Sequence, residues 1–572
     1  MQLCGSDILV KTLIEQGCET VFGYPGGQIL NVYDSLYKYQ NEINHVLCAH
    51  EQGAAHAADG YARTTGKVGV VISTSGPGAT NLVTGIATAY LDSIPMVAIC
   101  GNVPTTQIGT DSFQEIDITG VTLPITKHNY FVSNVEDLAD TIREAFRLAK
   151  SGRPGPVLID VPKDVQIAKC EYEAEAPVEC DEPFAAKDVR IKEAADIINS
   201  AKRPFIYFGG GVITSNAQDE VLALAERIDA PIGCSLMGLS AIPTDHPRFL
   251  GMQGMHGHFA SSMSMHNADV ILSLGVRFND RVTGNRTKFA TGAKIVHVDV
   301  DGSELNKTVN SVCGLRGDVK MTLQKLLPLL NGGTKPDWMA KVEAFRKEEE
   351  TYLDNREGLT PRRAILTVNK YLGENTAVCT DVGQHQMWSA QSLNFKTARR
   401  FASSGGLGTM GYGFGAAIGA AYGTGERSVL ITGDGSFGMN LNELATAVRY
   451  GVPVVVVIMN NGVLGMVRQW QKLFYGKRYA MTCLRAGKAC EGKCGTEGCE
   501  CPPYTPDFVK LAESYGAKGI RVFKPEDVKA AFEEARKNTK TPTLIEFIID
   551  PEDLVYPMVK PGGTLEELIM DC

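Results

Sequence analysis

The chain has 572 residues, of which 44% are hydrophobic and 21% are charged, a composition typical of globular proteins. Its net charge of −9 and the lack of a long basic run argue against a nucleic-acid-binding surface. The sequence has no stretch of 18 apolar residues and no signal or transit peptide pattern, so we expect a cytoplasmic protein without a membrane span.

The first notable segment follows the apolar run INHVLCA, which predicts a strand leading into a helix that starts near Glu51. The helix is rich in small residues, and Ala54, Ala57, Ala58 and Ala62 give it one thin face. A thin face of this kind predicts close packing against another element.

Two segments far apart in the chain share one layout. Residues 67–102 and 427–462 each contain an apolar run, a Gly-x-Gly turn, a helical stretch, a turn with proline, and a second apolar run ending in asparagine. Continuous apolar strands around a helix predict a right-handed βαβ unit of a parallel sheet covered on both faces. The repeat predicts that the first and last parts of the chain have the same fold.

The middle of the chain has apolar runs at 203–213, 268–280 and 294–305, which predict buried strands. Two acidic stretches separate the three regions and are predicted to be linkers or solvated faces. The fold class expected is therefore α/β, with three doubly wound parallel-sheet domains. The predicted domains are 1–165, 185–335 and 360–550, followed by a tail at 551–572.

The strongest local signal is GDGSF at residues 433–437 together with NNG at 460–462. Asp434 and Asn461 both follow predicted adjacent strands, where open α/β sheets bind ligands. A carboxylate, an amide oxygen and the Val463 carbonyl form an incomplete oxygen set that suits Mg²⁺. The backbone N–H groups of Gly435 and Ser436 are predicted to open the next helix and face an anion. The alternative is two ordinary turns, Asp-Gly and Asn-Gly.

Five of the 15 cysteines fall close together near the end of the chain. Their spacings contain no CxxC pair, so a zinc or iron–sulfur site, a redox-labile loop and a Gly-rich surface insertion all stay open. The other ten are scattered singly, several of them inside or beside apolar runs, and are predicted to be buried reduced thiols. The clustered cysteines are Cys483, Cys490, Cys494, Cys499 and Cys501.

GDG followed by about 27 residues and NN resembles the fingerprint of thiamine-diphosphate-dependent enzymes, in which a pyrimidine-binding and a diphosphate-binding domain share one fold. In HEQGAAHAADGYAR, the resemblance makes Glu51 the residue that activates the aminopyrimidine; a helix N-terminal charge is the simpler alternative. In GQHQMW and GLGTMGYG it implies cofactor contacts by Gln384, His385, Gly408 and Met410.

The motifs VFGYPGGQIL, SFQEIDITG, GVRFNDRVTGN and GMVRQWQ narrow the resemblance to the acetohydroxyacid (acetolactate) synthase catalytic subunits, over nearly the whole chain. This implies a catalytic role for Gln114, and a central domain that binds FAD without using it for redox chemistry. The FAD contacts implied are Arg153, Gly210, His256, Arg277, Asp299 and Asp318. The substrate contacts implied are Phe113, Lys163, Met255, Asp280, Arg281, Met466 and Trp470.

The activity implied is that of a transferase: decarboxylation of pyruvate on thiamine diphosphate with Mg²⁺, and transfer of the hydroxyethyl group to pyruvate or 2-oxobutyrate, in branched-chain amino-acid synthesis. The resemblance also implies a homodimer or homotetramer with interfacial active sites and a small regulatory subunit. A pyruvate oxidase, a simple 2-oxo acid decarboxylase and a catalytically silent cofactor-binding regulator are the alternatives.

Overall fold

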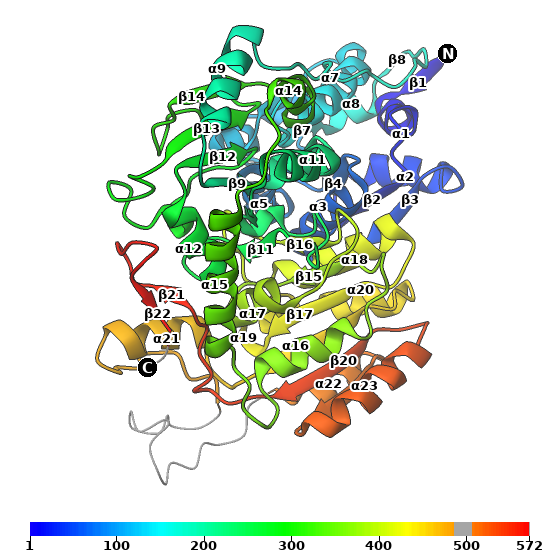
Figure 1. Ribbon diagram of the computed structural model, residues 1–572. Coiled ribbons are helices and arrows are strands. Elements are labelled where there is room, and N and C mark those ends of the chain that lie inside the picture. Colours follow the sequence, from blue (N-terminus) through cyan, green and yellow to red (C-terminus); the bar gives the residue numbers. More distant parts are fainter. Residues whose placement is uncertain (486–505, 571–572) are drawn as a thin grey trace. The chain divides into compact units, whose positions relative to one another are not determined.

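The structure is a computed structural model that describes residues 1–485 and 506–570. Its contacts divide the chain into two compact units, which are described separately. The first unit contains two six-stranded sheets and the second contains one (Figure 1). The first unit comprises Met1–Asp181, Asn375–His385 and Ala402–Pro551, and the second comprises Glu182–Glu374, Gln386–Phe401 and Glu552–Cys572.

The N-terminal sheet is parallel throughout, with the strand order β3-β2-β4-β5-β7-β6. Every residue of β4, β5 and β7 is buried, as expected for strands covered by helices on both faces. A short antiparallel ribbon joins β1 (Gln2–Cys4) to β8 (Lys169–Glu171). The strands of the sheet are β2 (Thr20–Gly23), β3 (Asn44–Leu47), β4 (Gly69–Ser73), β5 (Met96–Asn102), β6 (His128–Phe131) and β7 (Pro156–Pro162). The helices are α1 (Gly5–Glu15), α2 (Leu30–Lys38), α3 (Glu51–Thr65), α4 (Pro77–Asn81), α5 (Val83–Asp92), α6 (Ile118–Thr122), α7 (Leu138–Lys150) and α8 (Lys163–Ile167).

The second sheet of this unit repeats that topology, with the order β16-β15-β17-β18-β20-β19. Numbered by their succession along the chain, the strands of both sheets run 2-1-3-4-6-5, and the repeat predicted from the sequence corresponds to β4–β5 and β17–β18. The strands are β15 (Val378–Thr380), β16 (Phe401–Ser403), β17 (Val429–Gly433), β18 (Val455–Asn460), β19 (Lys518–Val522) and β20 (Thr543–Ile548). The helices are α18 (Tyr412–Thr424), α19 (Asp434–Asn440), α20 (Glu443–Arg449), α21 (Gly465–Phe474), α22 (Phe508–Ser514) and α23 (Pro525–Lys537). The first two residues of α17 (Gln384–Ser392) also belong to this unit, and the rest of that helix belongs to the second.

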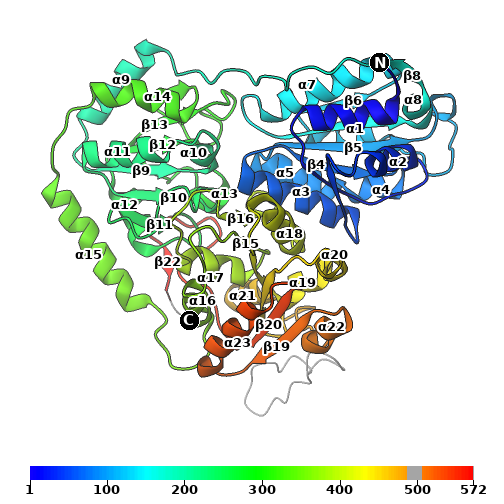
Figure 2. The ribbon, with the colours of Figure 1, turned by 90° about the vertical axis from the view of Figure 1, so that its right-hand side faces the viewer.

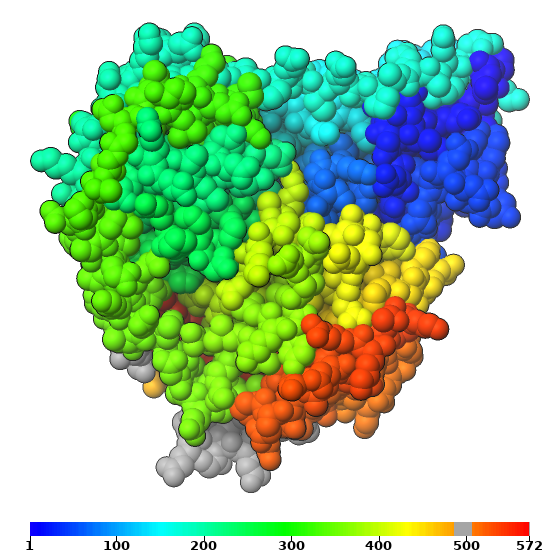
Figure 3. Space-filling view, turned by 45° about the vertical axis from the view of Figure 1, so that its right-hand side comes forward, coloured from blue at the N-terminus to red at the C-terminus, as the bar shows by residue number. Residues whose placement is uncertain are grey.

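Helices α3 and α18 join the two halves of the first unit and lie side by side (Figure 2). The blue N-terminal surface accordingly borders the yellow surface of the later half (Figure 3). The predicted thin face of α3 is confirmed, because its alanines are buried. Backbone touches backbone: a Cβ added at Gly60 would lie 2.1 Å from the Ala416 carbonyl oxygen, and one at Gly419 would lie 1.8 Å from that of Ala57.

Replacing Gly419 by alanine is expected to destabilise the protein by about 1–3 kcal/mol, because the added methyl group forces the two helix backbones apart. A thermal unfolding scan of the full chain measures the change as a lower transition temperature. Gly292→Ala is the control, since its Cβ would meet nothing within 4 Å. Equal transition temperatures for the two variants would contradict the close packing.

The second unit has its own parallel sheet, with the order β11-β10-β9-β12-β13-β14. In chain succession this is 3-2-1-4-5-6, the order of doubly wound dinucleotide-binding sheets. The strands are β9 (Pro204–Phe208), β10 (Ile232–Cys234), β11 (Phe249–Met252), β12 (Val270–Leu274), β13 (Lys294–Asp299) and β14 (Cys313–Arg316), with a separate antiparallel pair β21 (Met558–Val559) and β22 (Leu568–Ile569). The helices are α9 (Asp188–Asn199), α10 (Gly210–Thr214), α11 (Gln218–Ile228), α12 (Phe259–Asn267), α13 (Asp280–Thr283), α14 (Val319–Leu326), α15 (Pro336–Tyr352) and α16 (Pro361–Asn369).

The predicted fold class is confirmed: the structure is α/β, with three parallel six-stranded sheets. The acidic stretch expected after the central domain contains α15, which buries Trp338 and Val342 and so packs as part of its unit. The numerical domain boundaries stay a prediction. In the part of the chain that the structure describes, no helix is long and apolar enough to cross a membrane.

Candidate active site

Glu51 is the first residue of α3, and only Cys48, Ala49 and His50 separate it from the end of β3, so the predicted strand-to-helix order is confirmed. Its N-cap, His50, accepts a hydrogen bond from the Gln52 N–H through its side chain, at 3.1 Å. The Glu51 side chain is buried, and its Oε2 accepts a hydrogen bond of 2.9 Å from Asn81 Nδ2. Because Asn81 ends α4, the N-terminal repeat holds this carboxylate at the carboxyl edge of its own sheet.

Gln114 lies in the loop after β5, and it adopts a left-handed backbone conformation with φ 62°. This conformation is unfavourable for a residue with a side chain and marks a fixed local geometry. The loop contacts Gly76, where an added Cβ would lie 2.9 Å from the Gln114 Cα, and an added Cβ at Gly78 would lie 3.2 Å from Glu51 Oε1. Glu51 and Gln114 thus flank one glycine-lined turn, while Phe113 is 84% exposed.

The predicted metal ligands come together at the equivalent edge of the second sheet. Asp434 begins α19 directly after β17, one residue earlier than predicted, and Asn461 follows the neighbouring strand β18. Asp434 Oδ2 accepts a hydrogen bond of 2.9 Å from the Gly462 N–H, which places the two turns in contact. Burial raises the pKa of the Asp434 carboxyl to about 7, although hydrogen bonds from backbone N–H groups act in the opposite direction. Val463 is also buried, and its N–H donates to Asn461 Oδ1 at 3.1 Å.

Gln384 and His385 reach this edge from the start of α17, which follows β15. The Gln384 amide donates to Gln469 Oε1 at 3.0 Å and accepts from Asn461 Nδ2 at 3.4 Å. Burial lowers the pKa of His385 to about 3, so the ring is neutral. Its Nε2 is buried without a hydrogen-bond partner among the described residues, which leaves a polar atom for a ligand to satisfy.

Met410 faces the glycine turn of the metal motif, with its Cε 3.8 Å from where a Cβ at Gly435 would lie. Gly408, two residues earlier, has a positive φ of 72°. Ser436 is buried, and its hydroxyl donates to the Val382 carbonyl at 2.8 Å. The cofactor contact predicted at Met410 therefore lies beside the turn that carries Asp434.

The segment before Met410 is held by residues that the sequence did not single out. Asp92, at the end of α5, accepts hydrogen bonds from the N–H groups of Gly405 and Gly406 at 3.1 and 2.7 Å. Arg63 on α3 pairs with Asp92 at 2.8 Å, and both side chains are buried. The N-terminal half thus fixes the loop that presents Met410.

Glu443 is a second residue that the sequence did not single out. It starts α20, is fully buried, and accepts hydrogen bonds from the N–H groups of Ala49 and His50 at 3.2 and 3.0 Å. Gly53 makes room for it, because an added Cβ there would lie 2.1 Å from Glu443 Oε1. Burial raises the pKa of the Glu443 carboxyl. The later half of the unit thereby fixes the backbone directly before Glu51.

Met466 and Trp470 are one turn apart on α21, the helix that follows the metal motif. Trp470 packs edge-to-face on Phe474, with ring centroids 5.6 Å apart. Both predicted residues are partly exposed, so they are available to a bound molecule.

In the second unit, four predicted FAD contacts follow adjacent strands of the central sheet. Gly210 follows β9, Arg277 follows β12, Asp299 ends β13, and Asp318 follows β14 as the N-cap of α14. The turns after β9 and β12 touch, since a Cβ at Gly211 would lie 2.6 Å from the Gly275 Cα. This is the switch point of the sheet, where doubly wound folds bind ligands.

The remaining predicted FAD and substrate contacts include residues of each unit. In the second unit His256 is buried beside the Pro557 carbonyl, and the Met255 N–H donates to the Arg281 carbonyl at 2.7 Å. The Arg281 and Asp280 side chains are 60% and 77% exposed. In the first unit Lys163 Nζ donates to the Gly27 carbonyl at 3.4 Å, and Arg153 Nε donates to Ser93 Oγ at 2.9 Å.

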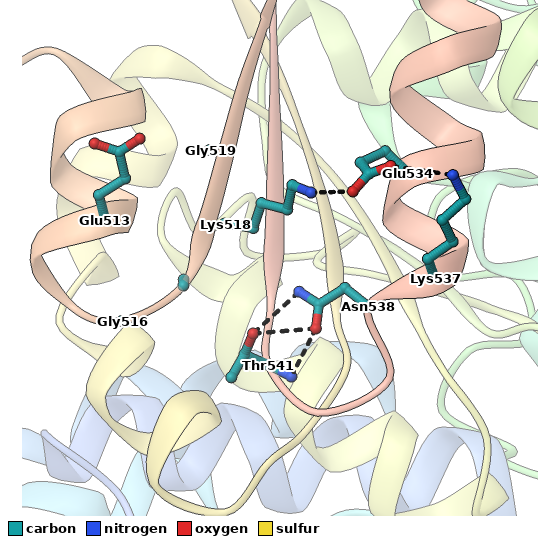
Figure 4. A pocket seen from close by; sticks show the side chains of 9 residues that line it. Glu513, Gly516, Lys518, Gly519, Glu534, Lys537, Asn538 and Thr541 are labelled. Atoms are coloured by element: carbon teal, nitrogen blue, oxygen red, sulfur yellow. Dashed lines mark hydrogen bonds and ion pairs between the residues drawn. The ribbon is translucent and has the colours of Figure 1, made fainter.

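A surface pocket of the first unit lies elsewhere (Figure 4). Lys518 at the start of β19 and Thr541 just before β20 line it, so it opens at the amino edge of the sheet that carries Asp434 at its carboxyl edge. An ion pair between Lys518 and Glu534 crosses it. None of the predicted site residues lines it.

The cysteine cluster falls mostly outside the described residues, because Cys490, Cys494, Cys499 and Cys501 lie within 486–505. Cys483 carries a free thiol, as do nine other described cysteines. The predicted burial is wrong for Cys4, Cys170 and Cys180, which are only partly buried, because the first two belong to the two-stranded β1–β8 ribbon and the third to an acidic stretch without helix or strand. Within 1–485 and 506–570, no group of His, Cys, Asp and Glu side chains forms a ready metal site. The three interpretations of the cluster stay predictions.

Known protein families match all three regions. Residues 4–121, 191–326 and 381–547 match the N-terminal TPP binding domain, the central domain and the C-terminal TPP binding domain of the thiamine pyrophosphate enzymes. The chain is 44% identical to the "Probable acetolactate synthase large subunit" of Methanocaldococcus jannaschii, over 99% of this chain and 95% of that protein.

Two bacterial acetolactate synthases are similar to the chain to nearly the same degree. The chain is 41% identical to the "Acetolactate synthase isozyme 3 large subunit" of Escherichia coli, over 99% of this chain and 98% of that protein. It is 42% identical to the "Acetolactate synthase" of Mycobacterium leprae, over 99% of this chain and 90% of that protein. Likeness at this level along the whole chain, together with the duplicated sheets and their two site clusters, means that this protein belongs to the acetolactate synthase large-subunit family of thiamine pyrophosphate enzymes.

Proposed function

We propose that this protein catalyses the acetolactate synthase reaction, in which one pyruvate loses CO₂ and its remaining two-carbon unit joins the carbonyl carbon of a second 2-oxo acid. With pyruvate as acceptor the products are 2-acetolactate and CO₂, and one proton is consumed. With 2-oxobutyrate the product is 2-aceto-2-hydroxybutyrate. The observation that carries the proposal is the full-length identity of 41–44% to acetolactate synthase large subunits.

The site residues fit thiamine diphosphate and Mg²⁺. Asp434, Asn461 and Val463 offer an anionic, an amide and a carbonyl oxygen on two touching turns, which leaves coordination positions for phosphate oxygens and water. The unsatisfied His385 Nε2, the Gln384 amide and the N–H groups of Gly435 and Ser436 would hold the diphosphate. When bound, thiamine diphosphate supplies the carbon nucleophile and the electron sink for decarboxylation.

The chain's own contribution is a proton relay and orientation. The Glu51 carboxyl, held by Asn81 and by the backbone that Glu443 fixes, would share a proton with the pyrimidine ring. Met410, an apolar side chain beside the Gly435 turn, would contact the cofactor there. Gln114, in its fixed left-handed conformation, would orient the reacting carbons.

The substrate contacts that we propose include residues of the first unit and residues of the second. Trp470 and Met466 would pack the alkyl group of the acceptor, and the exposed guanidinium of Arg281 would attract its carboxylate. Phe113, Lys163, Met255 and Asp280 would complete the pocket and its channel. Core packing for Trp470 and a surface ion pair for Arg281 are the structural alternatives, and an Arg281–Asp280 pair of 3.7 Å exists.

The second unit would bind FAD in a non-redox role. Its 3-2-1-4-5-6 strand order and the close glycine turns at the switch point support this proposal. The Asp318 carboxylate caps α14, where it accepts a hydrogen bond of 3.0 Å from the Met321 N–H. The flavin nucleotide and the helix N-terminus would therefore share this carboxylate. The residues proposed are Gly210, His256, Arg277, Asp299 and Asp318 of the second unit, together with Arg153 of the first.

We further propose a homodimer or homotetramer, with Glu51 and Asp434 of each site supplied by different subunits, and a small regulatory partner. Relatives are named large subunits, which supports the partner. The ten free thiols in the described part of the chain support a reducing compartment, the cytoplasm.

Product analysis tests the reaction. The pure protein is incubated without oxygen with pyruvate, thiamine diphosphate, Mg²⁺ and FAD, with or without 2-oxobutyrate. We expect acetolactate alone in the first case and an added acetohydroxybutyrate in the second, both identified by mass spectrometry. Acetaldehyde would indicate a decarboxylase, flavin-dependent acetyl oxidation would indicate an oxidase, and cofactor binding without turnover would favour the silent regulator.

A further inference from the structure

A short segment immediately before residue 486 lies across the metal motif. Val463 and Cys483 form an isolated antiparallel bridge. On either side of it the Leu484 N–H donates to the Gly462 carbonyl at 2.9 Å, and the Leu464 N–H donates to the Thr482 carbonyl at 2.8 Å. Two backbone hydrogen bonds therefore fix the position of residues 482–485 against the turn that carries Asn461.

Thr482 and Leu484 anchor this segment further. The Thr482 hydroxyl donates to Gln471 Oε1 on α21 at 2.9 Å. Leu484 reaches the other turn of the motif, since its Cδ1 would lie 3.3 Å from a Cβ at Gly435. The segment thus touches both glycine turns that carry the proposed metal ligands.

Arg485 is the residue that this segment brings to the site. Its guanidinium lies close to Gly462, where an added Cβ would lie 2.5 Å from Nε and 3.0 Å from both Cζ and Nη2. Its Nη2 donates to the Asn461 carbonyl at 3.2 Å, and its Nε is buried without a hydrogen-bond partner in the described part of the chain. Glycine at 462, with φ 70°, makes this approach possible.

The positive charge of Arg485 indicates that an anion binds at this site. Among the described residues Arg485 forms no ion pair with a carboxylate, and Asp434 is the nearby carboxylate that its charge influences. Once a divalent cation occupies Asp434 and Asn461, that carboxylate is taken, and a guanidinium beside the cation needs a negative partner. A planar guanidinium whose Nε has no hydrogen-bond partner among the described residues matches phosphate oxygens.

We propose that Arg485 is a diphosphate-binding residue, which contacts the phosphate oxygens of the cofactor beside the metal ligands. This rests on the proposed function, because the ligand is the thiamine diphosphate of that site. Residues 482–485 therefore supply a cation at the start of the cysteine-rich stretch, and this assignment is separate from any role of the cysteines.

The test compares Arg485→Gln with the unaltered full-length protein in Mg²⁺. Glutamine keeps an N–H donor for the Asn461 carbonyl but removes the charge. We expect the dissociation constant of thiamine diphosphate, followed by tryptophan fluorescence, to rise about 10- to 100-fold, with little change for unphosphorylated thiamine. Arg485→Lys is expected to recover part of the loss, and the exposed Lys477→Gln is the matched control.

A purely structural role would weaken both ligands equally or leave both unchanged, and either result overturns the proposal. The same affinity for thiamine diphosphate in Arg485→Gln and Lys477→Gln also overturns it. Failure of the unaltered protein to bind thiamine diphosphate would overturn the proposed function itself and the role of Arg485 with it. If Arg485→Gln does not fold, the Arg485→Lys comparison decides between the outcomes, since full affinity there would contradict guanidinium-specific phosphate binding.

Discussion

Replacing Glu51 by glutamine is expected to lower turnover of pyruvate by about 100- to 10,000-fold, because the amide cannot exchange a proton with the pyrimidine ring. The amide oxygen still accepts the hydrogen bond from Asn81, so the fold and the cofactor affinity are expected to change little. Steady-state turnover and a separate fluorescence titration with thiamine diphosphate measure the two effects.

Glu42→Gln is the control for the Glu51 experiment, because Glu42 is an exposed glutamate of the same domain. The loss in Glu51→Gln should be a loss of turnover number rather than of affinity. Turnover close to that of the control would remove Glu51 from the catalytic role and leave it as a helix N-terminal charge.

Replacing Asp434 by alanine is expected to weaken thiamine diphosphate binding in Mg²⁺ by about 100-fold or more, and to abolish turnover at moderate cofactor concentration. The reason is that Asp434 is the anionic member of the proposed metal-ligand set, next to the turn that carries Asn461. One of its oxygens accepts a hydrogen bond from the Gly462 N–H of that turn. Titration of the cofactor at several Mg²⁺ concentrations measures the loss and shows whether more metal compensates for it.

Asp527→Ala is the matched control for Asp434, since Asp527 is an exposed aspartate near the start of α23 in the same half of the unit. It should leave the Mg²⁺ dependence unchanged. Cofactor binding by Asp434→Ala that depends on Mg²⁺ as in the control would place the metal elsewhere.

Much of the fold and of the site could be predicted because the relevant signals are local. Apolar β-branched runs marked the strands, and Asp434 and Asn461 followed two runs of one repeat. The register of β17 and β18, with Gly433 opposite Met459, shows why these positions meet: adjacent parallel strands end at the same edge.

The residues that hold the site from the other half of the unit could not be predicted. Glu443 and Asp92 act on backbone segments far away in sequence, at Ala49–His50 and at Gly405–Gly406. Their partners depend on how α3 and α18 pack, which is a tertiary contact with no local signal. Arg485 was missed for the same reason, since its neighbours gave no regular pattern from which a bridge to Val463 could be inferred.

The carbon balance of pyruvate turnover tests the proposed reaction most directly. The unaltered protein, loaded with thiamine diphosphate, Mg²⁺ and FAD, is supplied with uniformly ¹³C-labelled pyruvate, and released CO₂ and the remaining carbon products are measured together. We predict that two pyruvates disappear for each CO₂ and that the remaining five carbons appear in acetolactate. One CO₂ for each pyruvate, with the other carbons in acetaldehyde or acetate, would contradict it.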